Sequence, residues 1–292
     1  MATDASAPSA DLREPWRSGG PLTFWRERRL LWQLARSVRS RRLQGTLLGK
    51  VWDYINPLVQ FSVYFLVIGK LLGLERAVPN FPLYIFTGLT TVQYFIGGLQ
   101  ATTDSFTRNR VLVRRAVFPR ELLPASRLLS EFVALGPPLI ILVIVALAFG
   151  WRPDAISLAL AVLGVVLMAV FTFGLGLAFG VANVFIRDTR QVVGVITTLS
   201  RWAVPIIYPW TLVPDRFGDG WITTLYLANP VTIAVFGVRE AFWHPTVDTP
   251  FPPIPVESVL IGCGMTVLAV VVGYLVLRQY QFRMVQRLRW ST

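Results

Sequence analysis

The sequence predicts an all-α integral membrane protein that crosses the bilayer six times and keeps both chain ends in the cytoplasm. Hydrophobic residues occupy 54% of the 292 positions and charged residues only 15%, whereas soluble domains carry about 25% charge. Long apolar runs recur along the whole chain, and most of the basic residues lie at the ends of those runs. So little charge cannot solvate the whole surface, and part of it must therefore face lipid.

The N-terminal region divides into a tail and a helix. Residues 1–20 are rich in Ala, Ser and Pro and lack the apolar core of a signal peptide, which predicts a disordered cytoplasmic tail. Residues 24–48 are predicted to form an amphipathic helix, with Phe24, Leu31, Leu34, Ala35 and Val38 on one face and arginines opposite. Such a helix lies in the membrane interface with Trp25 and Trp32 at the headgroups. A soluble helix packed on another domain is the alternative.

Six apolar runs are long enough for the roughly 30 Å hydrocarbon core, which takes about 20 residues. They lie at approximately 54–72, 83–101, 132–150, 156–182, 191–210 and 256–277. The first two are the least apolar, because they hold Asn56, Gln60, Thr87, Thr90, Thr91, Gln93 and Gln100. The fourth is rich in small residues, and its Gly174, Gly176 and Gly180 would let another helix approach closely.

The distribution of Lys and Arg predicts the orientation. With the N-terminus inside, the cytoplasmic segments hold 22 of the 28 basic residues and the outer segments hold five, while Arg201 lies within a span. Cytoplasmic loops of membrane proteins carry the excess of Lys and Arg. Both termini are therefore predicted to be cytoplasmic.

Two loops between the spans are predicted to carry structure. Residues 107–130 interleave arginines with apolar residues and contain Pro119 and Pro124, which favours a short helix that docks into a partner protein over simple contact with the membrane surface. Residues 210–255 lie outside and are largely apolar over 221–238, but Asn229-Pro230 interrupts that stretch. A pair of short re-entrant helices between spans five and six fits this pattern, with backbone groups satisfied by protein or water.

Several chemistries are excluded or disfavoured. The net charge of +12 follows the span ends rather than a polar face, so we expect no nucleic-acid binding. Cys263 and His244 are each the single residue of their type, so no metal site is expected. The segment 45–51 has three residues between its glycines and Val51 after Lys50, so it fails as a phosphate-binding P-loop. No carboxylate lies in the middle of a span, which disfavours a proton relay.

The spans still contain candidate contacts for a substrate. A charge at the bilayer centre costs about 3 kcal/mol, so Arg201 should face protein or water, either to contact an anionic substrate group or to pair with another helix. The aromatic residues of the helices expected to line a pore suit stacking on sugar rings, although aromatic residues are equally normal at lipid-facing positions. These residues are Tyr54, Phe61, Tyr64, Phe65, Tyr94, Phe95, Trp202 and Tyr208.

The order of several motifs resembles that in a known family. An arginine-rich helix precedes LGKVWDYINP at 48–57, and FPRELLP follows at 118–124, Arg187-Asp188 after the fourth span, and Asn229-Pro230 with Arg239 in the outer loop. Over residues 22–290 the chain resembles the membrane subunits of polysaccharide ABC exporters of the O-antigen and teichoic-acid type. The arginine-heavy composition is most similar to the actinobacterial branch, which includes exporters of the mycobacterial galactan precursor.

The resemblance implies how the protein works and with what partners. It implies one transmembrane domain over residues 21–292, in the bacterial plasma membrane, as a homodimer joined to two copies of a separate ATPase that binds ATP and magnesium. This chain is then no enzyme and holds no cofactor. The dimer would export a lipid-linked polysaccharide, with outer gate helices within 211–240.

The resemblance also implies roles for particular arginines. The coupling helix that contacts the ATPase would include Arg108, Arg110, Arg114, Arg115 and Phe118. Arg36, Arg39, Arg41 and Arg42 of the interface helix would meet the lipid pyrophosphate, since guanidinium groups bind phosphate oxygens in a fork. Alternatively, these four arginines contact the headgroups of membrane lipids.

The sequence is also compatible with two other functions. A drug or small-lipid exporter with the same six spans would have a narrow and mostly apolar path. A membrane-embedded glycosyl- or lipid-transferase would need catalytic acids or His near the membrane surface. Asp53, Asp104, Glu121 and Asp188 are available for it, but no pair stands out.

Overall fold

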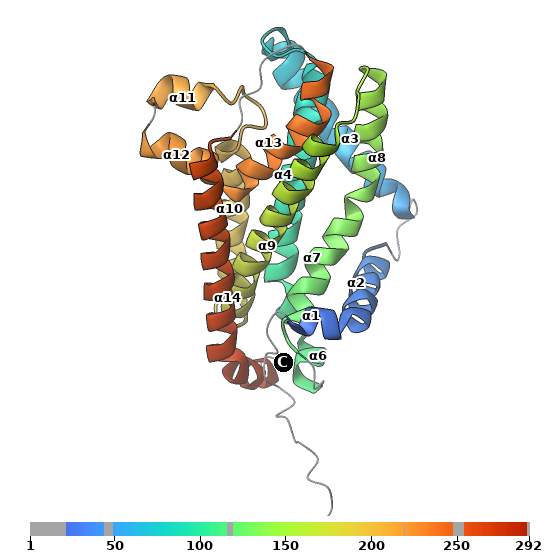
Figure 1. The fold of residues 1–292 in the computed structure, drawn as a ribbon. Coiled ribbons are helices and arrows are strands. Elements are labelled where there is room, and N and C mark those ends of the chain that lie inside the picture. The colour runs from blue at the N-terminus through green and yellow to red at the C-terminus, as the bar shows by residue number, and fades with distance from the viewer. Residues whose placement is uncertain (1–21, 44–48, 116–118, 219, 248–253, 291–292) are drawn as a thin grey trace, which may run out of the picture.

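The computed structural model describes residues 22–43, 49–115, 119–218, 220–247 and 254–290. Within these ranges every regular element is helical, as the sequence predicts. Figure 1 shows an upright bundle. The end that contains α6 (Arg110–Arg115) and the last turns of α14 (Val256–Trp290) is called the basic end below. The predicted disordered tail, 1–20, lies outside the described residues.

Four helical stretches are long and apolar enough to cross a membrane. The first, Gly49–Leu71, joins η1 (Gly49–Val51), α3 (Trp52–Tyr64) and the π-helical η2 (Phe65–Leu71). The second, Leu122–Ala148, joins α7 (Leu122–Ala134) to α8 (Gly136–Ala148). The other two are α9 (Ala155–Phe185) and Val256–Leu288 of α14. All four overlap predicted spans.

The bent pair α12 (Trp221–Ala228) and α13 (Pro230–Phe242) turns by 66° at Asn229, and counting it as one span would give five. It occupies the stretch for which the sequence predicts re-entrant helices. Asn229 begins α13 because its side chain accepts a hydrogen bond from the Val231 amide at 3.0 Å. The short α11 (Leu212–Phe217) precedes the pair, and η4 (His244–Thr246) follows it.

The predicted second and fifth spans correspond to α4 (Phe81–Thr103) and α10 (Thr189–Ala203). Neither is among the four long apolar helices. Threonines and glutamines dilute the apolar character of α4, and α10 has 15 residues and ends seven positions before the predicted limit. α4 is nonetheless the buried centre of the bundle, packed against α7, α9, α10 and α13. The count of six spans therefore stays a prediction.

The glycines of α9 allow the close approach that the sequence predicts. A Cβ on Gly174 would lie 2.5 Å from the Val270 nitrogen of α14, and a Cβ on Gly176 would overlap Thr102 of α4. A Cβ on Gly180 would lie 3.2 Å from the Phe106 ring. α9 therefore contacts α14 on one face and the α4–α5 region on another, which fixes the bundle around α4.

The interface helix is present but bent. α1 (Leu22–Arg26) and α2 (Arg28–Leu43) meet at Glu27, and α2 packs against α7 near the basic end (Figure 1). Phe24 meets Phe173 of α9 edge-on at 5.5 Å, and Ala35 is buried, while Arg36, Trp25 and Trp32 are exposed. Residues 44–48 lie outside the described part, so the predicted end of this helix is not described.

The basic end is more helical than the sequence suggests. α5 (Ser105–Arg108) and α6 follow α4, and α7 begins at Leu122, ten residues before the predicted third span. Pro124 is tolerated there because it lies in the first turn of α7. α14 likewise runs 13 residues past its predicted end at 277. Arg120 joins these two helices by donating a hydrogen bond to the Gln281 carbonyl, and burial lowers the pKa of its guanidinium, an effect that neighbouring Glu121 opposes.

Candidate functional site: a polar cavity between α3, α4 and α10

A cavity of about 1210 Å³ lies among α3, α4, α7 and α10. Its wall also takes Val38 from α2, Arg108 from α5 and Pro138 from α8. α4 contributes the largest share of the wall, and its polar residues Thr90, Gln93, Gln100 and Thr103 face this space. The cavity extends along α4 from Phe86 to Asp104, close to the whole length of the helix.

Uncharged polar side chains are frequent in the lining. Side-chain amides come from three helices, α3, α4 and α10; they are Asn56, Gln60, Gln93, Gln100 and Gln191. The aromatic residues of the lining are Trp52, Phe86 and Tyr94. Gln100 donates a hydrogen bond to Thr197 of α10 at 3.3 Å. Amides both donate and accept hydrogen bonds, so this wall can bind hydroxyl groups without a net charge.

The charges in the described lining balance. Three arginines (Arg108, Arg127, Arg190) accompany three acids (Asp53, Asp104, Glu131). Arg39 of α2 bridges to Asp53 at 2.7 Å, which joins the interface helix to the start of α3. Arg127 and Glu131 lie four residues apart on α7, a spacing that places opposite charges side by side. The cavity therefore offers hydrogen bonds more than an electrostatic field.

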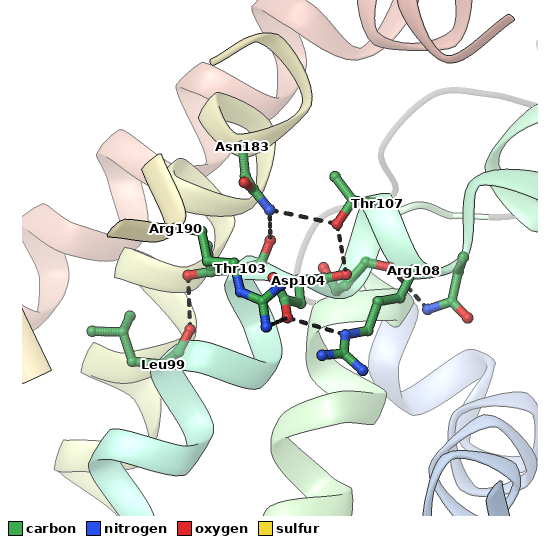
Figure 2. A network of polar contacts seen from close by, with 9 residues as sticks. Leu99, Thr103, Asp104, Thr107, Arg108, Asn183 and Arg190 are labelled. Atoms are coloured by element: carbon green, nitrogen blue, oxygen red, sulfur yellow. Dashed lines mark hydrogen bonds and ion pairs between the residues drawn. The ribbon is translucent and has the colours of Figure 1, made fainter. Parts of the chain in front are cut away.

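Asp104 lines the cavity at the C-terminal end of α4, and Figure 2 shows the polar contacts around it. Asp104 Oδ2 lies 3.0 Å from Arg108 Nε and 3.5 Å from Arg190 Nη2. Nearby, Asn183 of α9 donates to the Thr103 carbonyl at 3.2 Å and to Thr107 Oγ1 at 3.4 Å. This network brings α4, α5, α9 and α10 together at one point.

The predicted coupling residues gather at the basic end. Arg108 ends α5 and lines the cavity, and Arg110 begins α6 and is exposed. Arg114 and Arg115 lie on α6, but their side chains are not described, and Phe118 lies outside the described residues. Their contact with an ATPase stays a prediction.

The four interface arginines are all on α2. Arg36 is exposed, whereas Arg39 is half-buried and paired with Asp53. The side chains of Arg41 and Arg42 are not described. A pyrophosphate that used Arg39 would therefore have to share it with Asp53.

Tyr94 lies both among the aromatic candidates and in the cavity lining, where it meets Phe132 edge-on at 6.1 Å. Phe61 stacks on Phe65, Tyr64 packs on the core, and Phe95 stacks on Phe171. Tyr54 and Trp202 are exposed, and Tyr208 donates to the Trp202 carbonyl at 3.0 Å. Arg201 lies in the last turn of α10 and is half-buried. Their contact with substrate stays a prediction.

Two features of the site were not predicted from the sequence. The pairing of Asp104 with Arg190 joins residues far apart in sequence, although the glutamines of α3 and α4 already stood out as too polar for a span. Arg239 was counted in the outer loop, yet it is fully buried on α13. Its guanidinium lies 3.6 Å from the centre of the Tyr84 ring and donates to the Ile206 carbonyl at 3.1 Å. Arg239 thereby joins the bent pair to α4 and to the connector after α10.

Metal binding finds no support in the described residues, since no three His, Cys, Asp or Glu residues gather there in a way that could hold an ion. Cys263 on α14 is exposed and outside the cavity lining.

Comparison with known proteins gives consistent matches. A family model described as ABC-2 type transporter matches residues 29–243. The chain is similar to an O-antigen export system permease protein, RfbA, of Klebsiella pneumoniae, with 26% identity over 246 residues, 83% of this chain and 88% of the relative. The protein of the same name from Myxococcus xanthus is 25% identical over 223 residues, 76% of this chain and 83% of the relative.

Proposed function

Since the chain belongs to the ABC-2 type transporter family of membrane subunits, we propose that it forms the channel of an ATP-driven exporter for a lipid-linked polysaccharide. The relatives named as O-antigen export permeases support this substrate class. The resemblance to the actinobacterial branch favours a galactan precursor of the cell wall as the polymer. The export direction is from the cytoplasm across the bacterial plasma membrane.

The lining of the cavity carries this proposal. A polysaccharide presents many hydroxyl groups and few charges, and the described wall offers amides and aromatic rings with balanced charges. Conduction of a long chain needs contacts that are weak and repeated, because tight binding at one site would trap it. Hydrogen bonds from Gln93, Gln100 and their neighbours meet that requirement.

The cavity also supports six spans. α4 and α10 form its wall together with α3 and α7, which belong to the long apolar helices. Polar residues at membrane depth are expected where they line a water-filled path, so a conducting helix is less apolar than one that faces lipid. The excess of Lys and Arg at the basic end supports a cytoplasmic location for that end, and we propose that both termini lie there as well.

The motor would be a separate subunit. Two copies of this chain would pair, and each would contact one copy of an ABC ATPase that holds ATP and magnesium. α6 is the proposed coupling helix because it lies at the basic end (Figure 1) and follows α5 directly in the chain. The arginines of α2 would receive the lipid pyrophosphate at the membrane surface, and α12 with α13 would form the outer gate.

Stimulation of the ATPase separates this function from its two competitors. The permease is purified with its ATPase in nanodiscs, and ATP hydrolysis is measured with lipid-linked glycan extracted from the host or with a cationic amphiphilic drug. We expect the glycan to raise the rate and the drug to leave it at its basal value. Stimulation by the drug alone would identify a drug exporter, and sugar or lipid transfer by the permease without ATPase would identify a transferase.

A further inference from the structure

Asp104 occupies the junction between the channel wall and the proposed coupling region. It caps the C-terminus of α4, where its amide donates to the Gln100 and Thr102 carbonyls, and α5 begins at the next residue. Its side chain is 11% exposed. A carboxylate with so little access to water is stabilised by positive partners.

Two arginines from different elements share that carboxylate (Figure 2). Arg108 is four residues away on α5 and two residues before α6. Arg190 is the second residue of α10, and it also lines the cavity. Both contact the same oxygen, Oδ2, at 3.0 Å and 3.5 Å. The position of one guanidinium therefore affects how well the other can approach.

The α4 side of this junction is held in place. Asn183 of α9 bonds to Thr103 and Thr107 on either side of Asp104, and Gly180 lets the Phe106 ring lie against α9. α10 follows α9 after three residues, and the Arg190 side chain is 67% exposed. The ion pair with Asp104 is thus a polar link between the first turn of α10 and a fixed support.

The strength of the Arg190 contact suits a link that breaks and re-forms. At 3.5 Å it is longer than the usual N–H···O range of about 2.7–3.2 Å. Ion pairs with an exposed partner contribute about 0–1 kcal/mol. A displacement of α6 that turns away the Arg108 side chain, which is 56% exposed, would leave Asp104 to Arg190 and would draw the first turn of α10 toward the end of α4.

We propose that Asp104 is a positioning residue that passes movement of α6 to α10 by dividing its carboxylate between Arg108 and Arg190. The proposal rests on the proposed function, because it assumes that the ATPase moves α6 during ATP hydrolysis and that α10 lines the path of the glycan. It adds the residue that would connect the movement of α6 to the α10 wall of the cavity. Asp104 acts through the helices and needs no contact with the glycan.

The test is the amount of ATP hydrolysed per glycan exported. Variants replace the permease in its host, and export is the glycan on intact cells that reacts with periodate, which does not cross the membrane. ATP hydrolysis is measured on the purified permease–ATPase complex. Asp104→Asn keeps the size of the side chain and removes its charge. We expect the ratio of ATP hydrolysis to export to rise about fivefold or more, and Asp104→Glu to restore part of the coupling.

A double-mutant cycle excludes a merely structural effect. If Asp104 and Arg190 act as one unit, Arg190→Gln should raise the ratio of ATP hydrolysis to export in the unmodified protein. The same substitution should raise this ratio little further in the Asp104→Asn variant. Independent, multiplying effects of the two substitutions would overturn the proposal. The control is Arg278→Gln, which removes one exposed charge on α14 away from the cavity and should leave the ratio unchanged.

Each outcome has a distinct meaning. If the unmodified permease exports no glycan, the proposed function fails. If it exports glycan and Asp104→Asn leaves the ratio unchanged, this inference alone fails. If Asp104→Asn does not fold, Arg190→Gln decides by itself, because the exposed Arg190 side chain is dispensable for packing, and an unchanged ratio in that variant overturns the proposal.

Discussion

Replacing Gly174 with alanine is expected to separate α9 from α14 and to lower the thermal stability of the protein. The new Cβ would lie 2.5 Å from the Val270 nitrogen and 2.6 Å from the Ala269 carbonyl carbon. Both atoms belong to the backbone, so no side chain can turn away to make room. Overpacking of this kind costs about 1–3 kcal/mol and more where the backbone must move, so we expect about 3 kcal/mol at this crossing.

The matched control is the same substitution on α14 at Gly264, where nothing lies within 4 Å of a new Cβ. There alanine should gain about 1 kcal/mol of helix propensity over glycine. Unfolding of the purified protein, followed by tryptophan fluorescence in detergent, would compare the two. Equal midpoints for Gly174→Ala and Gly264→Ala would show that the α9–α14 crossing is looser than described.

Reversing the charges of Arg114 and Arg115 to glutamate is expected to uncouple export from ATP hydrolysis while the protein remains inserted. α6 carries both residues at the basic end. If α6 docks on the ATPase, the reversal places like charges together, and like-charge contacts across an interface cost several kcal/mol. At about 1.4 kcal/mol for each factor of ten, export should fall by a factor of ten or more.

The measurement combines export in cells with recovery of the ATPase on a tagged permease. The control is Arg152→Glu with Arg216→Glu, which changes the net charge equally at exposed positions outside the basic end. Cysteine accessibility would verify that both variants keep their orientation. Normal export and normal ATPase recovery with the α6 variant would remove α6 from the coupling role.

Hydropathy predicted the helices that face lipid better than the helices that line the cavity. The predicted spans at 156–182 and 256–277 lie within α9 and α14, because long runs without charge leave few alternatives to a membrane helix. α7 begins ten residues before the predicted third span, and hydropathy does not reveal this half of the helix because its Arg127 and Glu131 are charged and line the cavity. The extension of α14 was missed for a similar reason, because arginines replace apolar residues after 277.

The sequence indicated the candidate site only through polar residues in two spans that were otherwise apolar. Asn56, Gln60, Gln93 and Gln100 marked two spans as unusually polar, and the structure brings all four to one cavity. The ion pair of Asp104 with Arg190 was not visible, because it depends on how α10 returns beside α4. The burial of Arg239 depends likewise on the bend at Asn229, which turns α13 into the bundle.

The claim that the cavity is the path of the glycan is tested most directly by blocking it reversibly. Gly194 lines the cavity on α10, and nothing lies within 4 Å of a Cβ built there. A Gly194→Cys variant in a Cys263→Ser background, which removes the one native cysteine, accepts a bulky methanethiosulfonate reagent. Gly264→Cys, outside the cavity, is the control. We predict that the adduct at 194 stops export and that a reductant restores it. Undiminished export by fully modified protein would contradict the account.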